Sequence, residues 1–210
     1  MATQSERREK TRTAIVRAAK RIFGDRGFAA TTMDEIAAGA RVAKGAVYHH
    51  FKTKEELFEA VFDQVSRELV TELDRIARAE KDVLAAMAAG TEGYFAACAK
   101  GATGQIILRD GPAVLGWERW REIDAKHFGG KFPRALAIAI ETGLIVRQPV
   151  EPLARLLLGA VTEAAVACST GSDIAGAEYA RAFRRLLNAL RIKQAYKGRA
   201  LHPPQARGTS

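Results

Sequence analysis

The sequence predicts an all-α protein in which a three-helix helix-turn-helix head is followed by a larger helical body. Three observations predict this fold. Aromatic residues make up only 7% of the chain, while Ala, Leu and Arg are plentiful, and such a composition favours helices over strands. Apolar residues recur at helical spacing from residue 14 onward. Residues 32–51 have the pattern of two short helices joined by a tight turn.

The head is predicted to begin with a polar arm, residues 1–10, followed by a helix over residues 11–24. The apolar stripe of this helix consists of Ala14, Ile15, Ala18, Ala19, Ile22 and Phe23. Gly27 is expected to end it, because Gly commonly follows the last residue of a helix. Thr31 or Thr32 is expected to cap a second helix over residues 32–39, and Glu35, three residues after Thr32, matches a capping-box pattern. A third helix is expected over residues 44–51.

A long helix over residues 54–79 is expected to join the head to the body. Thr53 and Glu56 supply its cap pattern, and an unbroken apolar stripe follows. A rigid rod of this kind can transmit movement between the two parts. Further helices are expected over residues 81–100, 103–109, 117–128, 133–143, 152–169 and 173–196, separated by Gly and Pro. We define the head as residues 8–60, the body as residues 61–195 and the tail as residues 196–210, which are basic and expected to be disordered.

The charge is concentrated at the two ends of the chain. The formal net charge is +9 and the sequence pI is about 9.8, which makes a polyanionic partner plausible. Residues 1–60 hold 12 Lys and Arg against 8 Asp and Glu, residues 61–190 hold 16 of each, and residues 191–210 hold 5 basic and no acidic residues. A uniformly basic surface would instead carry its excess charge along the whole chain. For the tail, a solvated end is a simpler interpretation than a DNA contact.

Several classes of protein are not predicted. Cys98 and Cys168 lie far apart in Ala-rich surroundings, without a C-x-x-C motif, and are expected to be small core residues in a reducing cytoplasm. The four His residues complete no metal-ligand pattern, so neither a metal nor a cofactor is expected. The chain has no nucleophile motif and no glycine-rich phosphate loop. Its charged N-terminus and the absence of an apolar run of about 18 residues argue against a signal peptide and a membrane span.

Residues 32–51 separate into an inward and an outward set. The inward set, which holds the two short helices together, is Ile36, Ala37, Ala40, Val42 and Val47. The outward set is Lys44, Gly45, Ala46, Tyr48 and His49. A helix with so small, basic and aromatic a surface fits the major groove of DNA, which is about 12 Å wide. One helix then braces and the other reads, as in helix-turn-helix proteins.

The head resembles the TetR family of bacterial transcriptional regulators over residues 11–60. The matching residues are Phe23, Gly27, Phe28, Thr31, Thr32, Ile36, Ala37, Ala40, Val42, Lys44, Gly45, Tyr48, His50, Phe51, Lys54, Glu55 and Leu57. The resemblance implies a homodimeric, sequence-specific regulator that binds a palindromic operator in double-stranded DNA. It also implies a repressor that is released by a small-molecule effector bound in the body. The alternatives are a non-specific nucleic-acid-binding or scaffold protein and, less favoured, a helical-bundle enzyme.

The resemblance and the chemistry together predict the residues that contact DNA. They are Thr31, Thr32, Arg41, Lys44, Gly45, Ala46, Val47, Tyr48, His49 and Lys54. The start of the second helix offers a hydroxyl and free N–H groups to a phosphate, and Ala46 and Val47 offer methyl groups to thymine. Val47 is equally well interpreted as a core residue. For His49, mere solvation is the less favoured alternative to a DNA contact.

Two positions depart from the family's pattern. Arg41 stands where the turn usually has Gly, so we expect it to hold a left-handed backbone at a cost of about 1 kcal/mol, which a phosphate contact would offset. Ala43 stands where a residue with a capping side chain is usual. The missing capping hydrogen bond costs about 1 kcal/mol of helix stability.

The body is expected to supply a dimer interface and an effector pocket. Helices over residues 152–169 and 173–196 present apolar faces, and one such pair from each subunit would make a four-helix interface; burial within one subunit is the alternative. The candidate pocket residues are Phe62, Tyr94, Phe95, Trp117, Trp120, Arg121 and Phe128, with Glu118 and His127 as further polar anchors. Helical aromatic residues are more often core than pocket wall, although the Trp117–Trp120 spacing favours lining.

Overall fold

The protein is helical throughout the residues that the structure describes. The computed structural model describes residues 3–99, 101–169 and 175–192. The elements are α1 (Gln4–Arg26), α2 (Met33–Ala40), α3 (Lys44–His50), α4 (Lys54–Ala77), α5 (Val83–Ala99), α6 (Gly101–Gly104), the π-helical segment η1 (Gln105–Asp110), α7 (Gly111–Leu115), α8 (Trp117–Phe128), α9 (Lys131–Glu141), α10 (Val150–Ser169) and α11 (Gly176–Ala189). Within these ranges extended pairing is limited to one bridge between Ile145 and Arg191. The predicted all-α class is confirmed.

The first helix starts earlier than the sequence suggested. Residues 4–10, predicted to form a polar arm, are the first turns of α1. Thr3 and Glu6 close a capping box in which Thr3 N–H donates to the Glu6 carboxylate over 2.7 Å. This cap, together with helix-favouring Glu, Arg and Lys residues, extends the helix into solvent. Gly27 ends α1 as predicted, with φ +78° and its N–H donating to Phe23 O.

The core of the head is built on aromatic rings from three segments. The ring centroids of Phe23 and Phe58 lie 5.3 Å apart, as do those of Phe28 and Phe58, each pair edge to face. Ile36 and Val47 are fully buried in the same apolar core. The two short helices are therefore fixed to α1 and to the first turns of α4.

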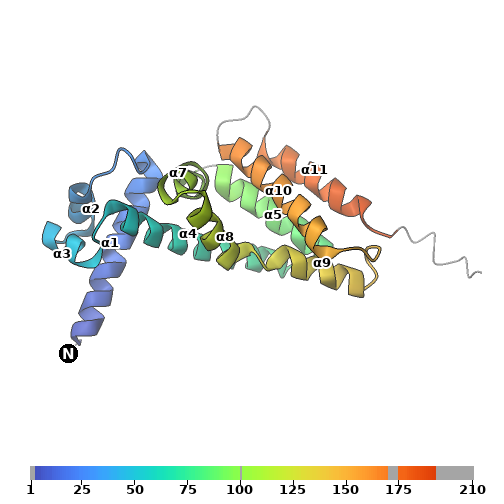
Figure 1. Ribbon diagram of the computed structural model, residues 1–210, viewed down its shortest axis with the longest axis horizontal. Coiled ribbons are helices and arrows are strands. Elements are labelled where there is room, and N and C mark those ends of the chain that lie inside the picture. The colour runs from blue at the N-terminus through green and yellow to red at the C-terminus, as the bar shows by residue number, and fades with distance from the viewer. Residues whose placement is uncertain (1–2, 100, 170–174, 193–210) are drawn as a thin grey trace, which may run out of the picture.

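The helix α4 connects this head to the body, as Figure 1 shows. Its 24 residues correspond to about 36 Å at 1.5 Å per residue, and its end lies within two residues of the prediction. Thr53 caps it by accepting from Glu56 N–H. Phe58 of α4 lies in the head's core, whereas Leu73 of α4 lines a cavity in the body.

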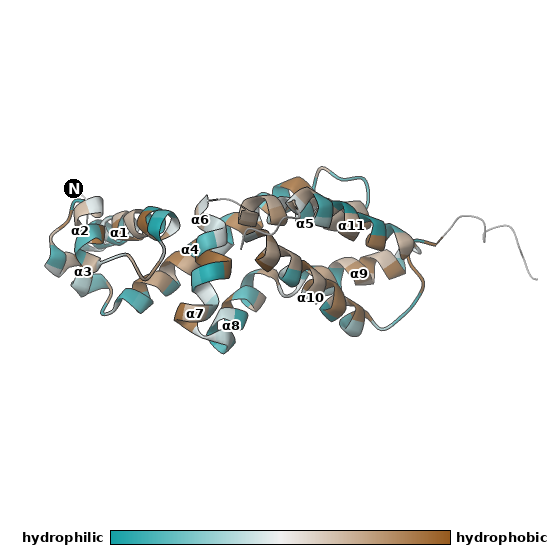
Figure 2. Cartoon of the chain, turned by 90° about the horizontal axis from the view of Figure 1, so that it is seen from above, coloured by the Kyte–Doolittle hydropathy of each residue, from teal (hydrophilic) through white to brown (hydrophobic). Residues whose placement is uncertain are grey.

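The body packs around α5, which contacts α4, α9, α10 and α11. Hydrophobic residues run along α9 and α10 in Figure 2. The sequence pattern predicts a break between the helices expected over residues 103–109 and 117–128, because Gly111 and Pro112 lie there. This prediction is wrong: α7 continues directly from η1 with Pro112 in its first turn, where proline costs no hydrogen bond. The last helix is shorter than predicted. Ile174, residues 193–196 and the predicted tail lie outside the described residues.

The head and body are joined by a hydrogen bond as well as by α4. Phe28 N–H, in the turn after α1, donates to Asp110 Oδ2 over 2.8 Å, and Gln105 Nε2 donates to Asp110 Oδ1 over 3.1 Å. Asp110 ends η1, so the π-helical segment positions a carboxylate against the head. The head is thereby held to the body by this hydrogen bond, in addition to α4 and the packing of α1 against α6 and η1.

Two expectations about composition need correction. Among the described residues α10 is long and apolar enough to cross a membrane by length and composition, although no such run was expected. Ala154, Leu157 and Val161 of this helix pack into the body's core. Cys98 is buried as predicted, whereas Cys168 is only partly buried.

Candidate nucleic-acid interface and effector cavity

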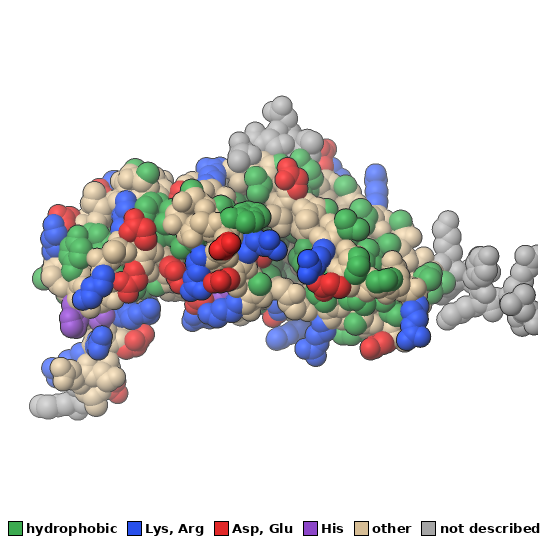
Figure 3. Space-filling view, in the orientation of Figure 1, with side chains coloured by type: hydrophobic (Ala, Val, Ile, Leu, Met, Phe, Trp, Pro, Cys, Tyr) green, Lys and Arg blue, Asp and Glu red, His purple; other side chains and the backbone are tan. Residues whose placement is uncertain are grey.

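The reading surface is the outer side of α3. Lys44, Gly45 and His49 are exposed, and Tyr48 is 41% exposed. Lys44 Nζ lies 2.8 Å from Asp34 Oδ1 of α2 in a pair open to solvent. His side chains lie beside Lys and Arg on this end of the molecule in Figure 3. The surface is cationic and small, as a helix that enters the major groove must be.

Three of the ten predicted DNA contacts are instead internal. Val47 is 0% exposed, so it packs in the core and presents no methyl group outward. Thr31 is 1% exposed, and its hydroxyl donates to Gly27 O over 2.7 Å. Lys54 Nζ donates to Phe28 O and Thr31 O, each over 2.9 Å, and lies over the Phe28 ring. Lys54 therefore braces the turn between α1 and α2.

Thr32 is exposed at the N-terminus of α2, but its hydroxyl is engaged. It accepts from Glu35 N–H over 3.2 Å and donates to the Glu35 carboxylate over 3.0 Å. The Glu35 pKa is lowered, first by the hydrogen bond from the Thr32 backbone. The predicted capping box is confirmed. A phosphate at this helix end has to compete with the Glu35 carboxylate.

The two departures in the turn have the predicted geometry. Arg41 has φ +57° and ψ +44°, the one positive φ outside glycine in the described ranges. Ala43 precedes α3 without a side-chain cap. In this conformation Arg41 lies beside two arginines that the sequence analysis did not single out. Arg17 and Arg21 lie with Arg41 around a hollow between α1 and α2, and their i, i+4 spacing was the available signal.

The body contains a cavity of about 300 Å³ between α4, α5, α8, α9 and α10. Tyr94 and Phe128 line it, as predicted. The other candidates do not. Phe62 and Phe95 are fully buried core residues, and Trp120 is buried with its Nε1–H donating to Ile107 O over 2.9 Å. Trp117 is 57% exposed and stacks on Trp120, while Arg121 points to solvent.

The cavity wall is mainly apolar with a few polar groups. The lining residues that sequence reasoning missed include Met87, Thr91, Asp124, Phe132 and Thr162. They come from several helices, and only the fold brings them together. Burial raises the pKa of Asp124 to about 6, although His127 and Arg121 oppose the shift. Burial also raises the pKa of Tyr94 well above its usual value.

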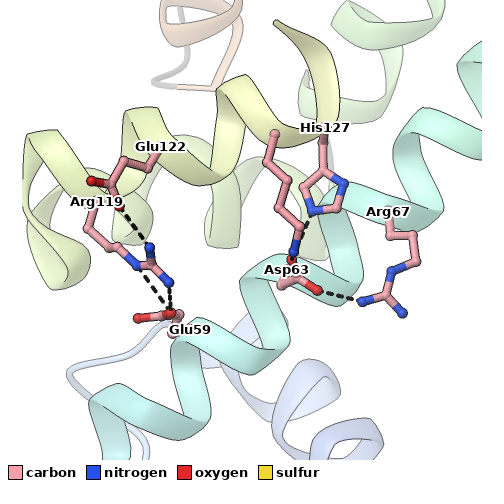
Figure 4. A network of polar contacts seen from close by, with 7 residues as sticks. Glu59, Asp63, Arg67, Arg119, Glu122 and His127 are labelled. Atoms are coloured by element: carbon pink, nitrogen blue, oxygen red, sulfur yellow. Dashed lines mark hydrogen bonds and ion pairs between the residues drawn. The ribbon is translucent and has the colours of Figure 1, made fainter.

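The helix α8 joins the cavity to α4 by ion pairs (Figure 4). Arg119 Nε donates to Glu59 Oε1 over 3.1 Å, and Lys126 Nζ lies 2.7 Å from Asp63 Oδ1. His127, a predicted pocket anchor, instead places Nε2 2.9 Å from Asp63. Glu118, the other anchor, is exposed outside the cavity.

Asp63 is the centre of this link. Burial acts to raise its pKa, but hydrogen bonds from Lys126, His127 and Arg67 outweigh burial and hold the pKa well below its usual range. The carboxylate therefore stays charged at neutral pH, and the link persists there.

Comparison with known proteins decides the family. A model described as the tetracyclin repressor-like C-terminal domain matches residues 84–190, about half of the chain. A second model, for bacterial regulatory proteins of the tetR family, matches residues 15–61. The chain belongs to the TetR family. Like its relatives, this TetR-family protein is a DNA-binding transcriptional regulator and not an enzyme.

Individual relatives agree with this assignment. The transposon Tn10 TetC protein of Escherichia coli is 26% identical over 159 residues, which cover 74% of this chain and 79% of TetC. The regulator TtgR of Pseudomonas putida is 41% identical over 78 residues, only 37% of each chain. The crystal structure of a TetR-family regulator from Pectobacterium atrosepticum matches with a TM-score of 0.78 and 29% identity, covering 91% of this chain and 99% of that one. TetR-family regulators typically form dimers and respond to small molecules.

Proposed function

We propose that this TetR-family regulator is a cytoplasmic homodimeric repressor that leaves a palindromic operator when a small molecule fills the body's cavity. The observation that carries the proposal is that α8 contacts both the cavity and α4. One face of α8 lines the cavity through Asp124 and Phe128, and other residues of α8 hold α4 through Glu59 and Asp63. The pair of α4 and α8 thus connects the cavity to the head that contacts DNA.

The DNA part of the proposal rests on the exposed side of α3. Lys44, Tyr48 and His49 supply phosphate and base-edge contacts, and the arginines around the hollow beside α2 supply further phosphate contacts. Arg41 keeps its predicted phosphate role. Two heads on one dimer read half-sites spaced by about one helical turn or a multiple of it.

The dimer is assigned to the outer faces of α10 and α11. Leu156 is 73% exposed and Leu186 is 46% exposed. Gly159 and Ala160 lie on the exposed side of α10, where small residues allow a second helix to approach. The apolar faces predicted for residues 152–169 and 173–196 also include Leu157, Val161, Phe183 and Leu187, which are buried within the subunit instead. The four-helix interface is therefore narrower than the sequence suggested.

Release requires that the effector favours one conformation over the other. A molecule in the cavity displaces α8, α8 carries Glu59 and Asp63 of α4 with it, and α4 changes the separation of the two heads. An effector that binds both conformations equally leaves the operator occupied.

The function is tested by gel shift with genomic fragments from upstream of the gene, against random DNA of equal length at moderate salt. Preferential binding to a palindrome is expected. Equal binding to random DNA would identify a charge-only binder and overturn the proposal.

The reading helix is tested in the same assay with Lys44→Ala. We expect weaker binding to every sequence and a salt dependence flattened by about one unit, because one phosphate contact is lost. The matched control is Lys81→Ala, an exposed lysine outside the head. An unchanged slope for Lys44→Ala removes Lys44 from the phosphate contacts.

A further inference from the structure

Asp124 places an unpaired carboxylate on the wall of the cavity. It lies on α8, one turn before Phe128, and both residues line the cavity. Among the residues that the structure describes, its carboxylate forms no hydrogen bond and no ion pair, unlike that of Asp63 on α4, which pairs with Lys126 and His127 of α8. A partly buried carboxylate without a partner is costly, and such groups are usually paired. At the wall of a cavity, such a carboxylate is suited to pair with a positively charged group of a ligand.

Aromatic rings stand beside this carboxylate. Phe128 follows Asp124 by four residues on α8, and its ring meets the Tyr94 ring edge to face at 6.0 Å. Phe132 also lines the cavity. Aromatic faces attract cations, so these rings and the carboxylate favour the same type of ligand group. A neutral hydroxyl group on a ligand would interact with the carboxylate but would gain no cation–π attraction from the rings.

We propose that the effector is an apolar organic molecule carrying a protonated amine, whose ammonium group pairs with Asp124 while its hydrocarbon part fills the cavity. The inference rests on the proposed function, in which this cavity receives the effector. Leu73, Met87 and Ile138 are among the apolar residues that surround the hydrocarbon part.

The positive groups at the cavity do not cancel this preference. Lys131 pairs with Asp74 over 2.6 Å, so its charge is already matched. Arg134 lines the cavity but is exposed. A charge open to solvent interacts more weakly with a ligand than a partly buried one. An anionic ligand held by Arg134 is the competing outcome that the test has to separate.

The test is calorimetric titration of the full-length dimer with three matched probes: phenylbutylamine, phenylbutanol and phenylbutyrate. They share one hydrocarbon skeleton and differ in a cationic, neutral or anionic end. We expect the amine to bind at least about tenfold more tightly than the alcohol, and the anion to bind weakest. Equal affinities, tighter binding of the anion, or no binding of any probe at millimolar concentration overturns the proposal.

The role of the carboxylate is tested with Asp124→Asn, which keeps the side-chain shape. The amine's advantage over the alcohol is expected to disappear, while affinity for the alcohol stays within about threefold. The control is Glu118→Gln, an exposed carboxylate of the same helix outside the cavity, for which the advantage should remain. Retention of the advantage in Asp124→Asn assigns the preference to another group and overturns the proposal.

A pH series adds an independent readout. The amine stays protonated, so its affinity for the wild type is expected to fall between about pH 8 and about pH 5 as Asp124 takes up a proton, and to fall less in Asp124→Asn. The comparison between the two proteins is needed because other groups face the same region. These are Arg121 and His127 of α8, Tyr94 and Cys98 of α5, Asp74 of α4, and Lys131 and Arg134 of α9.

Gel shift with each probe separates failure of this inference from failure of the proposed function. Amine binding with unchanged operator affinity supports the ligand class but contradicts release through the cavity. Release by the alcohol or the anion, with no preference for the amine, supports release and contradicts the ligand class.

Discussion

Neither packing nor backbone conformation within the protein requires glycine at position 45. A Cβ added there meets no atom within 4 Å, and its φ is not positive. Alanine favours helices by about 1 kcal/mol over glycine, so Gly45→Ala is expected to leave the melting temperature unchanged or raise it. Operator affinity should fall by about tenfold or more, because the methyl group occupies space at the groove floor. Thermal melting and gel shift check the two parts, and full affinity would contradict the docking of α3.

Asp124 makes the stability of the ligand-free protein depend on pH. Its pKa is raised to about 6 in the folded state by burial, against the opposing charges of His127 and Arg121. Its stabilising contribution is therefore fully present below its unfolded pKa and is lost as pH rises through about 6. Asp124→Asn is expected to be more stable than the wild type by roughly 1–2 kcal/mol at about pH 8 and equally stable near pH 4. Urea denaturation at the two pH values measures this, and the same difference at both would contradict it.

The residue-level predictions succeeded where helical periodicity decides orientation. The alternation of Ile36, Ala37 and Val47 with exposed neighbours follows from the 3.6-residue repeat. They failed where a side chain folds back on a distant segment. Lys54 reaches the carbonyl groups of Phe28 and Thr31, and no local pattern encodes that contact.

At the scale of elements, the pairing of α4 with α8 is open to a double-mutant cycle. Asp63→Asn and Lys126→Met are each expected to destabilise the protein, with a coupling energy of about 1 kcal/mol at neutral pH. The coupling should fade in acid, because the pKa of Asp63 is lowered, and its contribution is lost as pH falls through that value. Thermal melts of the four proteins give the coupling. Arg75→Met is the control, since Arg75 pairs with Glu72 inside α4, and additive effects of Asp63→Asn and Lys126→Met would mean that the link is not formed.

Element boundaries show which signals the sequence carries. Thr32 and Thr53 mark the starts of α2 and α4 by recognised cap patterns. The cap at Thr3 follows the same rule, but the polar sequence after it resembles an arm. Gly111-Pro112 resembles a break, yet the chain stays helical there because Pro112 falls in the first turn of α7.

At the scale of the whole molecule, operator binding is expected to depend on the outer faces of α10 and α11. Leu156→Arg places a charge at the centre of the proposed dimer surface and should give a monomer in sedimentation experiments. Affinity for the full palindrome should fall toward that for a half-site, because the second head no longer adds its contacts. The control Val146→Arg lies in the loop before α10 and is 62% exposed in the wild type. A Leu156→Arg protein that remains dimeric would place the interface elsewhere.

The family and the all-α class were predictable, because residues 11–60 carry a dense local motif and the composition favours helices. Of the seven candidate pocket residues, only Tyr94 and Phe128 line the cavity, and their contact with a ligand stays a prediction. Its wall is assembled from α4, α5, α8, α9 and α10, so its members share no spacing in the sequence. Aromatic residues are also needed in the core, and Phe62 and Phe95 serve there.

The link between α4 and α8 gives the proposed regulator a dependence on the cell's osmotic state. Arg119 and Lys126 are at least half exposed where they meet Glu59 and Asp63. Dissolved ions weaken such exposed pairs, and they do so more strongly as ionic strength rises and the screening length falls below about 8 Å. The same ions weaken the hold of α3 on DNA phosphates. A rise in intracellular potassium would therefore weaken both the binding of α3 to the operator and the ion pairs between α4 and α8. Effector sensitivity and promoter occupancy would then change together.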